Sequence, residues 1–166
     1  PDVSDLVILS AAQILWVNLV TDSFMAIALG LDPKEEDIMN YPPRDNSKSI
    51  FSGGLGRRVA WQGMMIGTLT FLAFFIGYTM TNGDQAHKVQ HAQTLTFMVL
   101  AISQLFHAFN VRSETHSIFS LRANKALIFA FFGALALQLL TVSVPFIANT
   151  VFGVDSVLTW GLIDWV

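Results

Sequence analysis

The stretch WVNLVTDSFMAIALG, residues 16–30, decides the fold of this chain. It belongs to an apolar run over about residues 7–30, and a bilayer is crossed by about 20 such residues. Asn18, Thr21 and Asp22 nevertheless lie in the middle of this run. A carboxylate at the centre of a membrane helix costs about 2.5–3.5 kcal/mol on insertion scales. These polar side chains therefore require an explanation.

The composition is that of an integral membrane protein. Of the 166 residues, 53% are hydrophobic and 13% are charged, and the mean hydropathy is +0.54. A soluble domain usually carries about 25% charged residues. Further apolar runs cover about 59–80, 92–109 and 126–147, and the apolar tail VLTWGLIDWV is too short to cross. We predict an all-α membrane protein, an antiparallel bundle of four transmembrane helices plus a truncated fifth.

The basic residues predict the orientation of the bundle. Eight of the nine Lys and Arg residues lie in the loops 31–58 and 110–125, and only Lys88 lies on the other side. The positive-inside rule places both loops in the cytoplasm. The surrounding partner is the lipid bilayer. There is no basic stripe that would bind nucleic acid, and the chain has no Cys for disulfide or thiol chemistry.

Asn18, Thr21 and Asp22 are candidate cation ligands. Asn18 and Asp22 are four residues apart, so they share one face of an α-helix, with Thr21 on its flank. Intramembrane carboxylates face a bundle interior or a wet cavity and mark ion pathways. Oxygen ligands suit a hard cation such as calcium. The alternative is a structural polar cluster that holds helices together.

Gln104, in the run 92–109, is a further candidate ligand. Its depth below the cytoplasmic end differs from that of Asp22 by only about 4–5 Å at 1.5 Å per residue. The alternative is an interhelical hydrogen bond. His107 lies nearer the interface and is expected to be a packing residue, and Gly63 and Gly67 have a helix-packing spacing. The chain has no glycine-rich phosphate loop, so we expect no catalytic residue in it.

The stretch ILWVNLVTDSFMAIALGLDPKEEDIMNYPPR, residues 14–44, resembles the sixth membrane segment and following loop of calcium-pump-like (type II) P-type ATPases. The family pattern is N-L-V-T-D, then A-L-G, then a proline and D-I-M, then P-P-R, and it is present here at 18–22, 28–30, 33, 37–39 and 42–44. HAFNVRSETHSIF, residues 107–119, is similar to the end of the eighth segment and its loop. The resemblance covers essentially the whole chain, 1–166. It implies that the four spans are the sixth to ninth of ten segments.

The resemblance implies a mechanism and a set of roles. In this family Mg-ATP phosphorylates an Asp in a cytoplasmic domain, and the phosphorylation cycle drives alternating access of ion sites between helices. Asn18, Thr21 and Asp22 match ligand positions of the sixth segment, where the family's helix is unwound, although this chain has neither Pro nor Gly there. Asp32 and Asp37 are candidates for contact with the phosphorylation domain; the alternative is a solvated acidic face.

The chain departs from the family pattern at Gln104, where the family often has a Glu. A complete second calcium site is therefore in doubt, and manganese becomes an alternative cargo. The D-K-T-G-T phosphorylation motif and the earlier segments are absent from the 166 residues, and the chain begins at Pro1. We expect a fragment of the transport domain that depends on the N-terminal part of the same pump and hydrolyses no ATP alone.

Two readings from other classes compete with the pump. One is a free-standing, non-catalytic four-helix membrane subunit or channel module. The other is a purely structural bundle in which Asp22 stays protonated. Replacing Asp22 with Asn leaves function intact in the last case and removes ion dependence in a pump.

Overall fold

The described part of the chain contains four membrane-length helices. The computed structural model describes residues 7–34, 38–40, 51–113 and 121–160, and this part of the chain contains no strand. The first membrane-length helix is continuous over Ala11–Gly30, and we call it the first rod because it consists of three helical segments. The others are α3 (Leu55–Met80), α4 (Gln85–Asn110) and α5 (Lys125–Ser143). Short helices complete the chain: η3 (Ile38–Asn40), η4 (Ser52–Gly54), η5 (Ile147–Phe152) and η6 (Val157–Thr159). The predicted all-α membrane bundle with a shorter fifth element is confirmed.

Local capping explains where these helices begin. Ser10 and Gln13 form a capping box at the first rod, which satisfies free N–H groups reciprocally. The side chains of Asp84 and Asn124 cap α4 and α5. Helix α4 therefore starts seven residues before the predicted apolar span, and residues 85–91 are helical rather than loop. Helix α5 ends at Ser143, ahead of Pro145, which has no N–H for the helix.

The first rod changes its winding in the middle. It consists of α1 (Ala11–Trp16), the π-helical segment η2 (Val17–Asp22) and α2 (Ser23–Gly30). In a π-helix the hydrogen bonds run from i to i+5, and such segments occur frequently at functional sites. No Pro or Gly marks the segment in the sequence. Asn18, Thr21 and Asp22 thus lie in the one stretch of this helix that is not α-helical.

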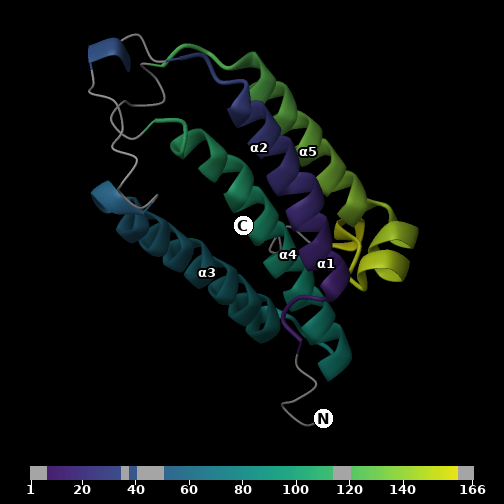
Figure 1. Cartoon of the computed structure of the whole chain (residues 1–166). Coiled ribbons are helices and arrows are strands. Elements are labelled where there is room, and N and C mark those ends of the chain that lie inside the picture. The colour runs from purple at the N-terminus through teal and green to yellow at the C-terminus, as the bar shows by residue number, and fades with distance from the viewer. Residues whose placement is uncertain (1–6, 35–37, 41–50, 114–120, 161–166) are drawn as a thin grey trace.

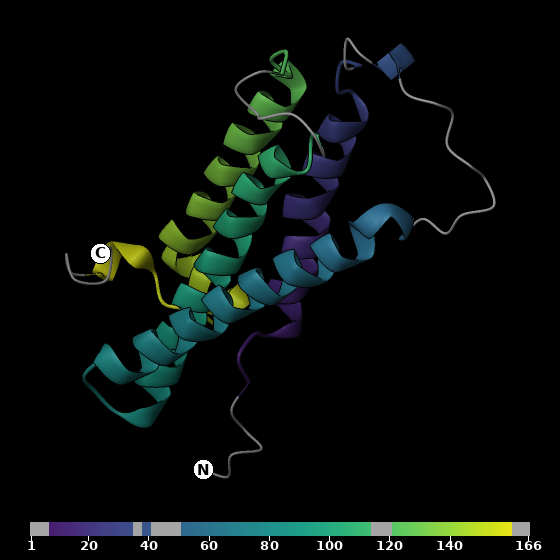
Figure 2. The same ribbon diagram turned by 90° about the vertical axis from the view of Figure 1, so that its left-hand side faces the viewer.

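Helix α5 packs against α2 and α4, and α3 packs against α4 and converges on it toward the C-terminal end of α3 (Figure 1 and Figure 2). Two apolar clusters form the core. One surrounds Phe97 and Val142, and the other surrounds Leu105 and Leu127. On α3, only Phe74 and Gly77 are buried.

Gly77 of α3 lies against the backbone of α4. A Cβ atom at Gly77 would lie 2.9 Å from Cα of Ala92, so only glycine allows this contact. A Cβ at Gly63 or Gly67 would meet no atom of the described residues within 4 Å. The packing expected at Gly63 and Gly67 is thus made at Gly77 in this chain, and the N-terminal half of α3 diverges from α4 (Figure 1 and Figure 2).

Candidate cation site

A pocket of about 410 Å³ lies between α2, α3 and α4. Most of its wall is apolar. The polar side chains that line it are those of Asp22, Gln62, Gln104 and His107. The pocket lies toward the end of the bundle where α2 and α4 end and α3 begins, which we call the loop end.

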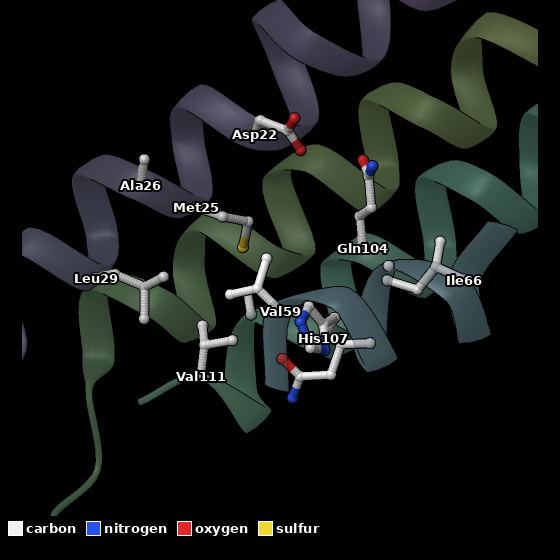
Figure 3. Close-up of a pocket in the computed structure, with 12 residues that line it drawn as sticks. Asp22, Met25, Ala26, Leu29, Val59, Ile66, Gln104, His107 and Val111 are labelled. Atoms are coloured by element: carbon white, nitrogen blue, oxygen red, sulfur yellow. The ribbon is translucent and has the colours of Figure 1, made fainter. Parts of the chain in front are cut away.

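Asp22 and Gln104 come to this pocket from different rods. Figure 3 shows the Asp22 carboxylate and the Gln104 amide pointing into the same space between their helices. The Oε1 atom of Gln104 and the Nδ1 atom of His107 are buried without a hydrogen-bond partner among the described residues. Leaving a buried polar atom unpaired costs about 1–3 kcal/mol. These atoms are therefore free to bind a ligand or another polar group.

The other two predicted ligands do not line the pocket. Thr21 is buried, with 2% of its surface exposed, and Asn18 is exposed. The shared face that motivated their grouping assumed α-helical spacing, which does not apply within η2. The backbone oxygen of Asn18 accepts a hydrogen bond of 3.2 Å from Ser23 Oγ. The structure thus brings Asp22 and Gln104 together and leaves Asn18 and Thr21 outside the pocket.

The described residues supply few ionic ligands. They contain no group of three or more His, Cys, Asp or Glu side chains that could hold a metal. Calcium takes 6–8 oxygen ligands. Asp22 offers a carboxylate and Gln104 a carbonyl oxygen, so this arrangement fits one wall of a hard-cation site rather than a whole one.

Asp32, expected to contact another domain, is paired within the chain. Arg112 Nη2 lies 2.9 Å from Asp32 Oδ1, and Arg112 Nε lies 3.1 Å from Asp32 Oδ2. Sequence reasoning used Arg112 only as one of the cations that orient the bundle. Its position directly after a predicted span was the available signal for a role at the helix end. Asp37 lies outside the described residues.

A second polar cluster lies at the opposite end of α4, which we call the tail end. His87 Nε2 is 3.8 Å from Asp155 Oδ2, and the Asp155 N–H donates to Thr94 Oγ1 at 2.9 Å. Burial raises the pKa of the Asp155 carboxyl, while the nearby His87 and His91 act in the opposite direction. Sequence reasoning missed this cluster because Asp155 lies 68 residues from His87.

The fold and the pocket together define a class: a multi-pass integral membrane protein with an open, partly polar pocket between its helices. Its family follows from the match of residues 6–166 to the model described as "Cation transporting ATPase, C-terminus". The chain belongs to this family, which confirms the resemblance described above.

Named relatives agree with the family. The chain is 39% identical to Calcium-transporting ATPase 1 of Bacillus cereus, over 91% of this chain and 18% of that protein. It is 42% identical to a Calcium-transporting ATPase of Bacillus subtilis, over 80% of this chain and 15% of that protein. For Calcium-transporting ATPase 1 of Lactococcus lactis the identity is 30%, over 95% of this chain and 17% of that protein. The chain thus spans less than a fifth of the length of these relatives.

Proposed function

We propose that this chain is part of the ion-translocating membrane domain of an ATP-driven P-type cation pump, with calcium as the transported cation. The observation that carries the proposal is the pocket that Asp22 and Gln104 both line, with Gln104 Oε1 buried and without a hydrogen-bond partner among the described residues. An anionic and a neutral oxygen donor between membrane helices suit a hard cation. The relatives, named as calcium-transporting ATPases, support calcium as the cargo.

In our proposal, the other parts of the pump lie outside these 166 residues. Earlier membrane segments of the same polypeptide complete the ligand set, and its cytoplasmic domains bind Mg-ATP and become phosphorylated. Asn18 and Thr21 belong to the proposed ligand set by their match to the family pattern. Both lie in the same π-helical segment η2 as Asp22. The relatives are more than five times longer than their matched regions, which favours a pump over a free-standing four-helix subunit.

The proposal also assigns two loops to one side of the membrane and names the cations that can be transported. The loops 31–58 and 110–125 face the cytoplasm, because they hold eight of the nine cations. Asp37 is proposed to contact the phosphorylation domain, whereas Asp32 is already paired with Arg112. Gln104 offers a neutral oxygen ligand in place of a carboxylate. We therefore propose a single cation site, which also accepts manganese.

The test is cation-dependent phosphorylation of the full-length pump in membranes. Acid-stable phosphoenzyme formed from ATP is measured against calcium, manganese, magnesium, sodium and potassium, with Asp22→Asn beside the parent. Dependence on micromolar calcium that the variant loses supports the proposal, whereas activation by manganese alone changes only the cargo.

The matched control is Asp84→Asn, which removes a carboxylate from the tail end. Asn caps helices about as well as Asp, so the start of α4 is preserved. We expect this control to phosphorylate as the parent does. Phosphorylation that depends on no cation, with Asp22→Asn behaving like the parent, would overturn the proposal.

A further inference from the structure

The inference begins with the ion pair between Asp32 and Arg112 at the loop end. Only 6% of the Arg112 side chain and 19% of the Asp32 side chain are exposed. Both carboxylate oxygens accept from the guanidinium, through Nε and Nη2. A planar guanidinium that binds a carboxylate in this forked way fixes orientation as well as distance. The pair therefore holds its two backbone segments in one relative position.

The same end has further bonds between helices. Arg112 Nη2 also donates to the backbone oxygen of Arg122 at 2.6 Å, in the segment that leads into α5. Asn124, the N-cap of α5, donates from Nδ2 to the backbone oxygen of Ala28 in α2 at 2.9 Å. The ends of α2 and α4 and the start of α5 are thus joined by side-chain hydrogen bonds.

The joined helices are the ones that carry the candidate site. Asp32 follows α2 and lies ten residues after Asp22, and Arg112 follows α4 and lies eight residues after Gln104. The helical parts of these separations, from Asp22 to Gly30 and from Gln104 to Asn110, are about 12 Å and 9 Å long at 1.5 Å per residue. Helices are stiff over such lengths, so a rotation or shift at the ion pair moves Asp22 relative to Gln104.

We propose that Asp32 and Arg112 are positioning residues for the cation site: their forked ion pair sets the register of α2 against α4 and so the relative placement of Asp22 and Gln104. This inference rests on the proposed function, because it assigns the pair to the site of that pump. It also gives Asp32 a role within this chain, in place of the expected contact with a distant domain.

The test uses the full-length pump with Arg112→Lys and the double variant Asp32→Asn, Arg112→Gln. Lysine keeps the charge but lacks the fork, and the double variant removes both charges, so neither leaves a buried carboxylate facing an uncharged partner. We expect both to raise the calcium concentration for half-maximal phosphorylation about tenfold or more, as losing the support of a metal ligand typically does. The maximal phosphoenzyme level at saturating calcium stays near that of the parent.

Controls separate this role from a purely structural one. Lys125→Gln removes an exposed cation from the same end of the bundle and should leave the calcium dependence unchanged. The thermal unfolding midpoint is measured for every variant. A parent-like calcium dependence in both test variants would overturn the inference, as would a shift that only follows a loss of stability. Asp22→Asn is run in parallel: if it abolishes calcium dependence while the pair variants change nothing, the inference fails and the proposed function stands. If Asp22→Asn also changes nothing, both fail.

Discussion

Two glutamines in membrane helices show how differently one side chain is used at the two ends of the bundle. Gln13, fully buried in α1, accepts from the Ser10 N–H and donates to the Phe152 oxygen, both at 3.0 Å. Gln104 in α4 has a buried Oε1 without a partner among the described residues, and it lines the pocket. The first is saturated and fixes structure, whereas the second is unsaturated and is available to a ligand.

The aspartates repeat the contrast. Asp32 is bound by the Arg112 fork, whereas Asp22 faces the pocket. In this comparison the bonded side chains of Gln13 and Asp32 hold segments of the chain together, whereas Asp22 and Gln104 line the pocket.

The largest expected difference is between Gln13→Leu and Gln104→Leu. Gln13→Leu leaves the Ser10 N–H and the Phe152 oxygen without their partner, at about 1–3 kcal/mol of unfolding free energy for each group. Gln104→Leu removes an unpaired atom, so stability stays at or above the parent level, while the calcium concentration for half-maximal phosphorylation rises about tenfold or more. Thermal unfolding in detergent and phosphorylation assays check both. The comparison would be wrong if Gln104→Leu lost stability and Gln13→Leu changed only the calcium dependence.

Next come two glycines of α3, Gly77→Ala and Gly67→Ala. A Cβ at Gly77 meets the backbone of Ala92, which a rotamer change cannot relieve, so we expect a loss of about 1–3 kcal/mol. At Gly67 the space is open within this chain, and alanine favours the helix by up to about 1 kcal/mol. Thermal unfolding midpoints measured in detergent should be lower than that of the parent for Gly77→Ala and not for Gly67→Ala. An equal loss at Gly67 would show that another segment of the pump packs there.

A smaller loss is expected at the start of α5. Asn124→Ala removes the cap on the Leu127 N–H and the donor to the Ala28 oxygen, both bonds of 2.9 Å. The loss of such a cap costs about 0.5–2 kcal/mol of unfolding free energy. Asn124→Asp keeps the cap acceptor but loses the donor, so its unfolding midpoint should lie between those of the alanine variant and the parent. If the aspartate variant unfolds at the same temperature as the parent, the bond from Asn124 to the Ala28 oxygen contributes nothing to stability.

The smallest effect is the pH dependence contributed by Asp155. Burial raises the pKa of this carboxyl above its ordinary value of 3.8, so the folded state holds the proton more tightly than the unfolded state. Stability is therefore lost as pH rises from 3.8 through the raised pKa, the opposite of the usual carboxylate. Asp155→Asn should remove this loss, so at pH 8 the variant should melt no lower than the parent. A lower midpoint at pH 8 would mean that the carboxylate is stabilising there.

Much of the fold was predictable from the sequence, because long apolar runs with few charges have few alternatives to membrane helices. Counting the rise per residue placed Asp22 and Gln104 at similar depths in the membrane, and both line the pocket. The positions of Asn18 and Thr21 were not predictable from helical spacing, since no Pro or Gly marks η2, although the resemblance implied an unwound helix there. Nor was the partner of Asp32, which lies 80 residues away and is set only by how the helices pack.

The π-helical segment has a mechanical consequence. The rod is bound near one end, where Gln13 is tied to the Phe152 oxygen, and beyond its other end by the Asp32–Arg112 pair. Between these fixed points, η2 contains a winding that can tighten from i→i+5 to i→i+4 bonds without breaking the chain. A one-residue change of winding turns the following residues by about 100° around the axis. Such a turn would swing the carboxylate of Asp22 away from Gln104 and would carry α2 with it, so the bonds that Ala28 and Asp32 make at the loop end would have to rearrange.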